Sequence, residues 1–363
     1  MKIGIITLPP SFNYGNILQA WALQTVLERM GHEVDIVIAR PRIYKLPLYK
    51  KPLVYAKRFL LKYILGNKNI ILRYEELLPD LLKHTERFIQ QHLHIHEYNS
   101  FINIGEENYE AYVVGSDQIW RRRYNSDIRN CYLSFTEGWR VKRIAYAASF
   151  GTTKWEYSSE ETIDCARLLG QFDGISVRES YAVNIVNEKF HLKAIHVLDP
   201  TLLLDKEDYL QLFLNASTPH SFGDMLCYIL GKETEFQRKI HTIATERGLK
   251  LFKVYSRFDD QSAPMSERVQ PPVETWLRGF YDAKLVVTDS FHATAFSIIF
   301  QKPLILFSSG IRGNERMESL LRMAGFDITN GITEKMFTPT IENINCLNVH
   351  RQEAFGFLAK YLS

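Results

Sequence analysis

The chain opens with KIGIITL at residues 2–8, PPSFNYGN at 9–16, ILQAWALQTVLERMG at 17–31 and, after His32, EVDIVI at 33–38. The first and last of these are short, continuous apolar runs, which are typical of buried parallel strands. Between them a polar turn extends to Asn16, apolar residues then recur at helical spacing, and Gly31 ends the predicted helix. A strand, a short loop, a helix and a second strand predict the start of a doubly wound parallel sheet.

The same alternation of strands and helices continues along the chain. Strand-like apolar runs lie at 111–116, 143–149, 174–178, 227–230, 250–255, 285–288 and 303–307. Helices are expected near 158–171, 233–247, 275–283, 291–300, 314–324 and 351–362. This pattern predicts an α/β protein of two doubly wound, Rossmann-like domains facing a cleft, at 1–172 and 173–345. We expect residues 346–363 to add a helix that packs back on the first domain, and ligands to bind where the strands end.

Length and composition narrow the class of protein. At about 100–200 residues per domain, 363 residues suggest two domains. Lys and Arg number 44 against 41 Asp and Glu, and the resulting net charge of +3 argues against nucleic acid as the main partner. The four cysteines are widely spaced and no long apolar run occurs, so we expect a cytoplasmic protein without a membrane-spanning segment.

The known cofactor and metal motifs are missing from the sequence. No GxxxxGK[ST], no GxGxxG after a strand, no HExxH and no GxSxG occurs. His92, His94 and His96 alternate, so a strand would place three imidazoles on one face, but no cysteine or paired carboxylate accompanies them. We therefore expect a solvated strand or loop at these histidines, with no metal site and no cofactor.

A basic and aromatic insertion interrupts the first domain at about residues 41–75. No acidic residue occurs between Asp35 and Glu75, whereas basic residues alternate there with Tyr and Phe, and residues 53–65 have an amphipathic helical pattern. Basic side chains are attracted to anionic lipid, and aromatic side chains suit the membrane interface. The insertion predicts peripheral contact with the anionic inner face of the cell membrane, with a solvated helix face as the alternative.

Polar and aromatic side chains follow the predicted strands of the first domain. This mixture suits hydrogen bonding to sugar hydroxyls and stacking on the apolar face of a sugar ring. The same residue types also cap helices and form turns, which is the alternative reading. The candidates for a sugar-binding side of the cleft are Asn13, Tyr14, Gly15, Asn16, Asp117 and Gln118.

Two residues of the second half have the character of an anion site. Arg178 follows the apolar run 174–177, and a lone Arg at a strand end is a good partner for an anion. His292 falls in the first turn of a predicted helix, where free N–H groups and the helix dipole favour an anion. A bound anion would restore the proton of His292 and make it a general acid. The alternative is a histidine that only bonds a backbone carbonyl.

A set of motifs in a fixed order resembles the polysaccharide pyruvyl transferase family. The resemblance covers roughly residues 1–330 and implies a fold like that of the GT-B glycosyltransferases. It also implies transfer of a pyruvyl group from phosphoenolpyruvate to sugar hydroxyls, which gives a ketal. The motifs are IITL at 5–8, NYGNILQA at 13–20, YVVGSDQIW at 112–120, ISVRES at 175–180, VLDPT at 197–201, TDSFHA at 288–293 and RGNER at 312–316.

The same resemblance implies roles for individual residues. Arg178 matches the Arg that holds the donor, and His292 matches the His that serves donor binding and proton transfer. Members of the family often carry Arg two positions before this His, where the present chain has Ser290. We expect Arg312 or Arg316 to supply the missing charge, and the alternative is a different donor or a different product. The expected donor-binding set is Arg178, Ser290, Phe291, His292, Arg312 and Arg316.

These roles lead to one expected reaction and two alternatives. His292 would protonate the methylene carbon of phosphoenolpyruvate, while Asp117 would orient or deprotonate the attacking hydroxyl. The acceptor would be a sugar or lipid-linked oligosaccharide, a precursor of a bacterial capsule or exopolysaccharide. A GT-B-type glycosyltransferase would instead use a nucleotide sugar, with Asp199 or Glu315 as a carboxylate partner. A non-catalytic sugar-binding partner is the third reading, because Ser290 replaces the family's Arg.

Overall fold

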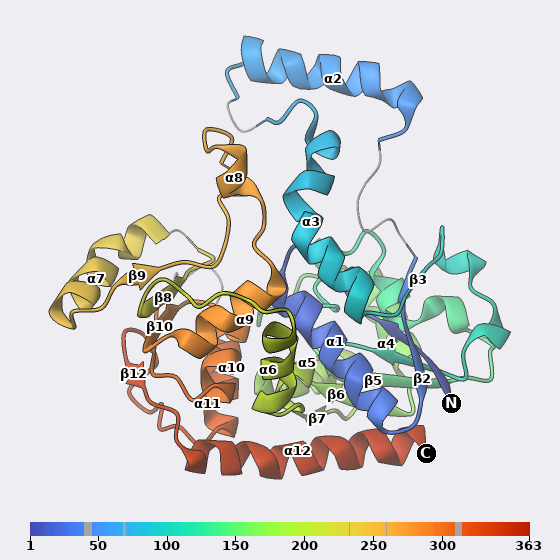
Figure 1. Cartoon of the computed structure of the whole chain (residues 1–363). Coiled ribbons are helices and arrows are strands. Elements are labelled where there is room, and N and C mark those ends of the chain that lie inside the picture. The colour runs from blue at the N-terminus through green and yellow to red at the C-terminus, as the bar shows by residue number, and fades with distance from the viewer. Residues whose placement is uncertain (40–45, 68–69, 232, 259, 309–313) are drawn as a thin grey trace.

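The computed structural model describes the chain except residues 40–45, 68–69, 232, 259 and 309–313, and it contains two β-sheets flanked by helices (Figure 1). The first sheet has seven parallel strands in the order β3-β2-β1-β4-β5-β6-β7. Its strands are β1 (Lys2–Ile6), β2 (Glu33–Ile38), β3 (Ile95–Glu97), β4 (Ala111–Val114), β5 (Lys142–Ala148), β6 (Gly174–Val177) and β7 (Ile195–His196).

The second sheet has five strands in the order β12-β11-β10-β8-β9, and it is parallel except where β12 runs against β11. Its strands are β8 (Met225–Tyr228), β9 (Leu251–Phe252), β10 (Leu285–Thr288), β11 (Leu304–Leu306) and β12 (Met336–Phe337). Each sheet is covered on both faces, which explains why its strands are continuous apolar runs rather than alternating ones.

The predicted domain boundary at 172/173 does not agree with the pairing of the strands. The strand expected to open the second domain, β6, pairs with β5, so that Ile144 lies opposite Gly174. β7 then pairs with β6, and the first sheet therefore extends to His196. A buried apolar run indicates a strand, but it carries no information about which sheet that strand joins.

The helices form layers on the two faces of each sheet. On the first sheet, α1 and α12 pack on one face, and α4 and α5 pack on the other. On the second sheet, α9, α10 and α11 share one core, and α7 covers the opposite face. These helices are α1 (Tyr14–Arg29), α4 (Ser159–Leu169), α5 (Ser180–Phe190), α7 (Glu233–Glu246), α9 (Val273–Asp282), α10 (Phe291–Ile299), α11 (Glu315–Met323) and α12 (Ile341–Leu362).

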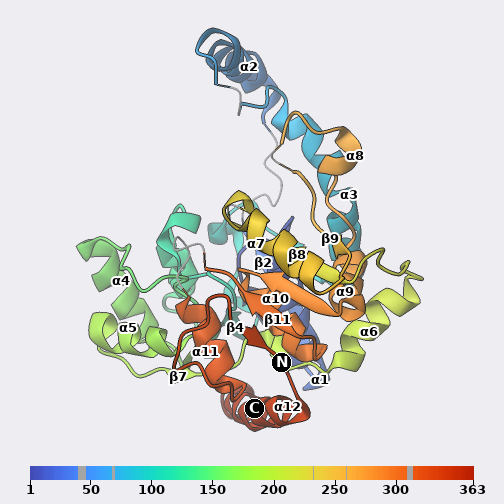
Figure 2. The same ribbon diagram turned by 90° about the vertical axis from the view of Figure 1, so that its left-hand side faces the viewer.

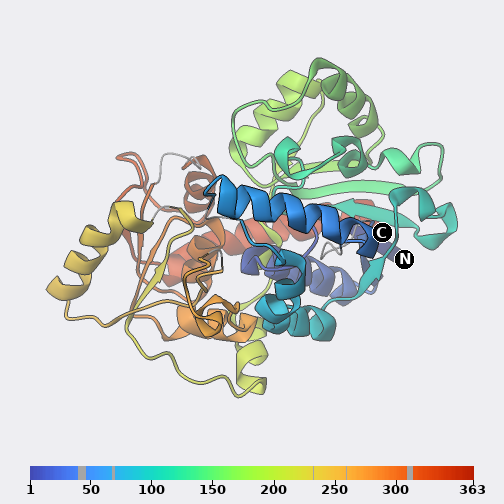
Figure 3. The same ribbon diagram turned by 90° about the horizontal axis from the view of Figure 1, so that it is seen from above.

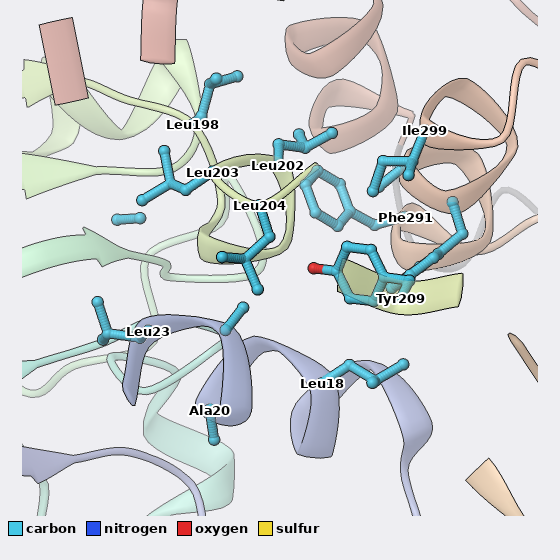
Figure 4. Packing of buried hydrophobic residues seen from close by; sticks show 14 of the residues in the cluster. Leu18, Ala20, Leu23, Leu198, Leu202, Leu203, Leu204, Tyr209, Phe291 and Ile299 are labelled. Carbon is cyan, nitrogen blue, oxygen red and sulfur yellow. The ribbon is translucent and has the colours of Figure 1, made fainter. Parts of the chain in front are cut away.

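One continuous hydrophobic core joins the two sheets. The crossover segment 197–204 lies between α1 and α10, where Leu202 and Leu204 pack near Phe291 and Tyr209 of α6 (Lys206–Asn215) (Figure 4). The long helix α12 passes along both halves of the molecule (Figure 1). Its Phe357 ring contacts Tyr146 of β5, and its N-terminal half packs against α10 and α11. This shared core fixes the position of the strand ends of one sheet relative to those of the other.

A helical arm projects from the body of the protein. It contains the 3₁₀ turn η1 (Leu48–Lys50), α2 (Lys51–Phe59) and the π-helical turn η2 (Leu60–Ile64). Below it, α3 (Tyr74–His92) leads back to the first sheet (Figure 1). Figure 2 shows α2 nearly end-on beyond α3 and α8 (Met265–Arg268), and Figure 3 looks down on α2 lying across the top of the molecule. Within the described residues, no helix is both long and apolar enough to span a bilayer.

Several helix limits differ from the sequence-based expectations for local reasons. α1 begins at Tyr14 rather than after Asn16, because the Asn13 side chain accepts a hydrogen bond from the Asn16 N–H at 3.3 Å. α12 begins ten residues before the expected start at 351, with Thr340 and Asn343 forming a capping box. The alternating histidines share no strand face, since His92 ends α3 and only His96 lies in β3.

Short 3₁₀ turns lie in the connections between β3 and β4, between β4 and β5, and between β7 and α6. They are η3 (Phe101–Asn103), η4 (Glu106–Asn108), η5 (Arg122–Tyr124), η6 (Ile128–Tyr132), η7 (Ser134–Thr136) and η8 (Pro200–Leu202).

Candidate functional site

Loops from both sheets meet at one buried polar cluster. The loop after β4 brings Asp117, the loop after β6 brings Arg178, and the segment after β7 brings Asp199. From the second sheet, the loop after β10 and the first turn of α10 bring His292. All four residues are less than one-tenth exposed. The meeting point lies at the carboxyl ends of parallel strands, where ligands of open α/β sheets bind.

Arg178 is the centre of this cluster. Its Nε donates to Glu179 Oε1 at 2.9 Å, and its Nη1 donates to Asp199 Oδ2 at 3.1 Å and lies 3.7 Å from Asp117 Oδ1. Burial alone would lower the pKa of the guanidinium, but the charges of Glu179, Asp199 and Asp117 raise it above its ordinary value. The guanidinium also lies over the Phe291 ring, 4.4 Å from the ring centroid. Arg178 is therefore a permanently charged group held on three sides.

Asp199 connects Arg178 to His292. Its Oδ1 accepts hydrogen bonds from the Thr201 N–H at 3.0 Å and from Thr201 Oγ1 at 2.7 Å. Its Oδ2 accepts from Ser116 Oγ at 3.1 Å and lies 3.8 Å from His292 Nε2. Burial favours the neutral acid, but the charges of His292 and Arg178 and the bonds from Thr201 hold the pKa of this carboxyl below its ordinary value. Asp199 is therefore an ionised group placed beside the imidazole.

The environment of His292 disfavours the protonated form of its imidazole in the absence of a further anion. Burial lowers the pKa of His292 below its ordinary value, although the charges of Asp199 and Asp117 oppose this shift. Its Nε2 is buried and has no hydrogen-bond partner among the described residues. The ring is held from the other side by Gly15, because a Cβ added to Gly15 would collide with the imidazole. His292 therefore has a fixed position and one unused ring nitrogen.

Replacing Gly15 with alanine should destabilise the protein by about 1–3 kcal/mol, because the added methyl group overpacks the contact with His292. Denaturant unfolding measures this change. Gly356→Ala is the matched control, since Gly356 lies within α12 and a Cβ there meets no atom within 4 Å. Equal stability of the two variants would contradict the close packing of His292 on Gly15.

Other buried polar atoms around Arg178 also lack partners in the part of the chain that the structure describes. They belong to Arg178 (Nη2), Arg316 (Nε), Glu179 (Oε2) and the hydroxyl of Tyr181. Burial, and then the like charge of Arg178, lower the pKa of Arg316 below its ordinary value. Burial raises the pKa of Tyr181, and the charges of Arg316 and Arg178 act against that shift. The two guanidiniums thus influence one another, and each retains a buried nitrogen without a hydrogen-bond partner among the described residues.

Unpartnered buried donors of this kind carry a free-energy cost unless a ligand completes them. The group that fits is a small anion with several oxygen atoms, since arginine N–H groups match carboxylate and phosphate geometry.

The expected donor-side residues are mostly brought together. The Phe291 ring contacts both Arg178 and His292, and Arg316 at the start of α11 is close enough to respond to the charge of Arg178. Ser290 acts as the N-cap of α10, with its Oγ accepting from the Ala293 N–H at 3.5 Å. Arg312 lies outside the described residues.

The side chains expected to bind a sugar largely make contacts within the protein instead. Asn13 caps α1, and the Asn16 side chain donates to the Leu8 carbonyl at 3.1 Å. The Tyr14 hydroxyl donates to the Pro271 carbonyl at 2.8 Å, and its ring is fully buried against Trp276. Gln118 Oε1 accepts from Arg121 Nη1 at 2.7 Å. Of the six candidates, Gly15 and Asp117 are the two that contact the buried cluster.

Two members of the cluster were not singled out from the sequence. Glu179 is fully buried, and its Oε1 accepts from both Arg178 and Ser149. Tyr181 presents a hydroxyl without a hydrogen-bond partner among the described residues. Glu179 and Tyr181 immediately follow the Ser-Val-Arg strand end, so proximity to Arg178 in the sequence was the available signal.

A small cavity lies beyond the ends of β1 and β2 on the side of the first sheet. Thr7 lines it and accepts a hydrogen bond from Gln19 Nε2 at 3.0 Å, while Gln19 Oε1 accepts from the Ser116 N–H at 3.0 Å. Through Ser116, this chain of hydrogen bonds reaches Asp199. The cavity has a volume of about 180 Å³, and its lining includes Thr7, Pro9, Ala39, Ser100, Phe101, Asn125, Ser126, Asp127 and Asn130.

Solved structures with the same architecture were found for the whole chain. UDP-GlcNAc 2-epimerase from Neisseria meningitidis, solved with UDP-GlcNAc, is similar with a TM-score of 0.53, 8% identity and coverage of 98% of this chain and 94% of that one. MnaA from S. aureus, solved with UDP, gives 0.46, 13%, 99% and 91%, and the E. coli heptosyltransferase WaaC with ADP gives 0.40, 12%, 98% and 100%. The protein has the GT-B-like α/β fold, and at these identities the similarity concerns the fold alone.

The sequence comparisons identify the family. No curated protein matched the chain by sequence. The model of the family described as polysaccharide pyruvyl transferase matches residues 13–310, which contain Asp117, Arg178 and His292. Because this match covers most of the chain, the protein belongs to the polysaccharide pyruvyl transferase family.

Proposed function

We propose that the buried cluster binds phosphoenolpyruvate, and that the protein transfers its enolpyruvyl group to two hydroxyls of a sugar to form a pyruvate ketal. One observation carries this proposal. Arg178 Nη2, Arg316 Nε and His292 Nε2 are buried nitrogen atoms without hydrogen-bond partners among the described residues, and the charges of Arg178 and Arg316 both act on His292. A doubly acidic enol ester would satisfy the two guanidiniums and restore the proton of the imidazole.

The donor would be held by charge and by the start of α10. The phosphate and the carboxylate of phosphoenolpyruvate would each meet a guanidinium, one from Arg178 and one from Arg316. The N-terminus of α10 begins at Phe291 and adds a favourable field for an anion. Ser290 replaces the Arg common in the family, and Arg316 supplies the second charge from α11.

The proton on His292 would start the reaction. His292 Nε2 gives its proton to the methylene carbon of the enol, which becomes a methyl group and leaves positive character at C2. A sugar hydroxyl attacks C2 and loses its proton to Asp117 or to the now neutral imidazole. The C2–O bond to phosphate then breaks, a second hydroxyl of the same sugar attacks C2, and its proton leaves with phosphate or to solvent. Asp199 stabilises the imidazolium before the first transfer.

The acceptor would approach from the first sheet. Asp117 lies 3.7 Å from Arg178 Nη1, so its carboxylate is next to the donor and able to orient a hydroxyl. The cavity beyond β1 and β2 offers hydroxyl and amide groups beside the Phe101 ring, a mixture suited to a sugar. We propose a sugar of a bacterial surface polysaccharide precursor, free or lipid-linked, as the acceptor.

A nucleotide-sugar reaction finds less support in these contacts. Its carboxylate partner would be Asp199 or Glu315, but Asp199 is fully buried and already accepts hydrogen bonds from Thr201, Ser116 and Arg178. Glu315 is exposed in the first turn of α11. Neither carboxylate is both free and placed within the cluster.

Thermal unfolding with ligands tests the donor. A ligand at about 100 times its Kd stabilises the folded state by about 2.7 kcal/mol, so phosphoenolpyruvate should raise Tm by several degrees. Arg316→Met should abolish this rise. Without ligand the same substitution should leave Tm unchanged or raise it, because it removes a buried charge that Arg178 repels. Inorganic phosphate at the same concentration is the control for non-specific anion binding.

The proposal fails if UDP-sugars raise Tm while phosphoenolpyruvate does not. It also fails if Arg316→Met keeps the full effect of phosphoenolpyruvate, since the second guanidinium would then have no part in binding.

A further inference from the structure

The helical arm, residues 48–65, carries the largest concentration of exposed apolar side chains in the described structure. Most exposed large apolar residues elsewhere are scattered singly, which is ordinary for a protein surface. On the arm they occur together within eighteen residues. They are Leu48, Tyr49, Leu53, Phe59, Leu60, Tyr63, Ile64 and Leu65, all more than half or about half exposed.

The apolar side chains of the arm share an outward face. Leu53, Leu60 and Ile64 are spaced at seven and four residues, which places them on one side of a helix. Other side chains of the arm are anchored to the first turn of α3. Arg58 pairs with Glu75 at 2.6 Å, and the Tyr55 hydroxyl donates to Glu76 at 2.9 Å.

The arm is also anchored to the second half of the molecule. Lys62 Nζ donates to Gln261 Oε1 at 2.8 Å, in the loop before α8. α2 lies across the top of the molecule (Figures 1 and 3), and its Leu53 and Phe59 side chains are exposed.

The positive charge of the arm favours an anionic lipid surface over a second copy of the protein as its partner. No acidic residue occurs between Asp35 and Glu75, so every charged residue of the arm itself is basic. Lys50 and Lys57 form no ion pair within the described part of the chain. Lys50 lies over the Tyr49 ring, with its Nζ 5.5 Å from the ring centroid. Two copies of this arm would bring like charges together, whereas an anionic lipid surface would complement them.

We infer that the arm is a docking surface for an anionic phospholipid membrane. The apolar face enters the interfacial region, Tyr49 and Tyr63 lie at headgroup level, and the lysines meet lipid phosphates. This binding does not require pyruvyl transfer. Combined with the proposed function, on which this last step rests, it makes a sugar carried on a membrane lipid the acceptor class, since the enzyme would be held where such carriers are.

Vesicle flotation tests the inference with the full-length protein. The wild type should float with vesicles of phosphatidylglycerol and phosphatidylcholine, and much less with pure phosphatidylcholine or at high salt. The double substitutions Leu53→Glu/Leu60→Glu and Lys50→Glu/Lys57→Glu should each reduce the bound fraction by about tenfold or more. Ile102→Glu/Ile163→Glu is the matched control, because both side chains are exposed apolar residues outside the arm, at 90% and 70%.

Two further measurements make each outcome decisive. Hydrogen exchange of the wild type with and without anionic vesicles should show protection confined to 48–65, which needs no variant. Light scattering reports the oligomeric state. Failure of the wild type to float, or equal flotation of arm variants and control, overturns the inference. So does a wild-type dimer that the arm variants convert to monomer without any vesicle binding, since a second copy would then cover the arm.

The Tm rise with phosphoenolpyruvate separates this inference from the proposed function. The arm variants should keep that rise in Tm and lose only their binding to vesicles. A protein that floats but gives no response to phosphoenolpyruvate would leave the membrane contact standing and remove the proposed reaction.

Discussion

The His292→Gln variant is expected to lose about 10²–10⁴-fold in turnover while keeping its fold, because glutamine fills similar space but cannot give a proton to the enol carbon. Turnover is measured as phosphate released from phosphoenolpyruvate with an acceptor that the wild type pyruvylates, and product mass confirms the added group. His92→Gln is the control, since His92 is a partly exposed histidine at the end of α3, packed against Phe88 and outside the cluster. Near-normal turnover of His292→Gln would exclude the imidazole as the acid.

The pH dependence of the wild type gives a second readout for His292. Burial lowers its pKa in the free protein, so the protonated form is lost as pH rises through a value below the ordinary one. A bound dianion favours the imidazolium and moves that pKa upward. We therefore expect kcat/KM, which reports the free enzyme, to fall at a lower pH than kcat, which reports the complex. A merely structural histidine would leave both profiles without this offset.

The Arg178→Met variant is expected to lose both donor binding and about 3–5 kcal/mol of unfolding free energy. The guanidinium bonds Glu179 and Asp199, so removing it leaves buried carboxylates without their countercharge. Arg178→Lys should recover part of the stability but not the Tm rise with phosphoenolpyruvate, because one ammonium cannot reproduce the two bonds of Nε and Nη1 and the free Nη2. Urea unfolding measures the first effect and ligand-dependent melting the second.

The stability loss of Arg178→Met should shrink in acid. In the wild type the pKa of Asp199 is depressed, so its contribution is present above the unfolded value of about 3.9 and is lost as pH falls through the folded value. Without Arg178, burial raises that pKa, and protonation relieves the uncompensated charge. The difference between wild type and variant should therefore be larger at pH 7 than at pH 5. A difference that stays constant over this range would mean that Asp199 does not depend on Arg178.

Arg316→Met is the informative comparison for both experiments. It removes a guanidinium from the same cluster, but one without a carboxylate bonded to its Nε. We expect Arg316→Met to lose the donor without losing stability, whereas Arg178→Met loses both. The pair of variants thus separates the anion-binding role from the structural one.

The elements near the N-terminus and around the candidate site were predictable from sequence because they depend on local patterns. The strand at 285–288 and the helix after it agree with β10 and α10. Arg178 and His292 could be chosen as site residues from sequence because one follows a predicted strand and the other lies at the start of a predicted helix. The predicted GT-B-like fold and the family are confirmed. Phosphoenolpyruvate, the acceptor and the membrane contact remain predictions.

The errors of the sequence-based interpretation share one cause. The polar residues after β1 have the composition of a sugar site, but Asn13 and Asn16 serve the backbone of their own loop and Tyr14 reaches Pro271 in the other half. Composition does not distinguish a side chain that binds a ligand from one that completes a turn. Only the partner that each group finds in the folded chain does so.

The amino-acid sequence by itself determined the order of strands and helices, the positions of the polar residues that follow each strand, and the basic, apolar composition of the arm. All of these follow from patterns that repeat over a few residues. The tertiary structure alone decided that β6 and β7 close the first sheet, that Asp199 joins Arg178 to His292, and that the arm stands clear of the body. These features depend on contacts between residues far apart in the chain. A local pattern indicates which side chains are buried, but it does not indicate which distant residues they contact.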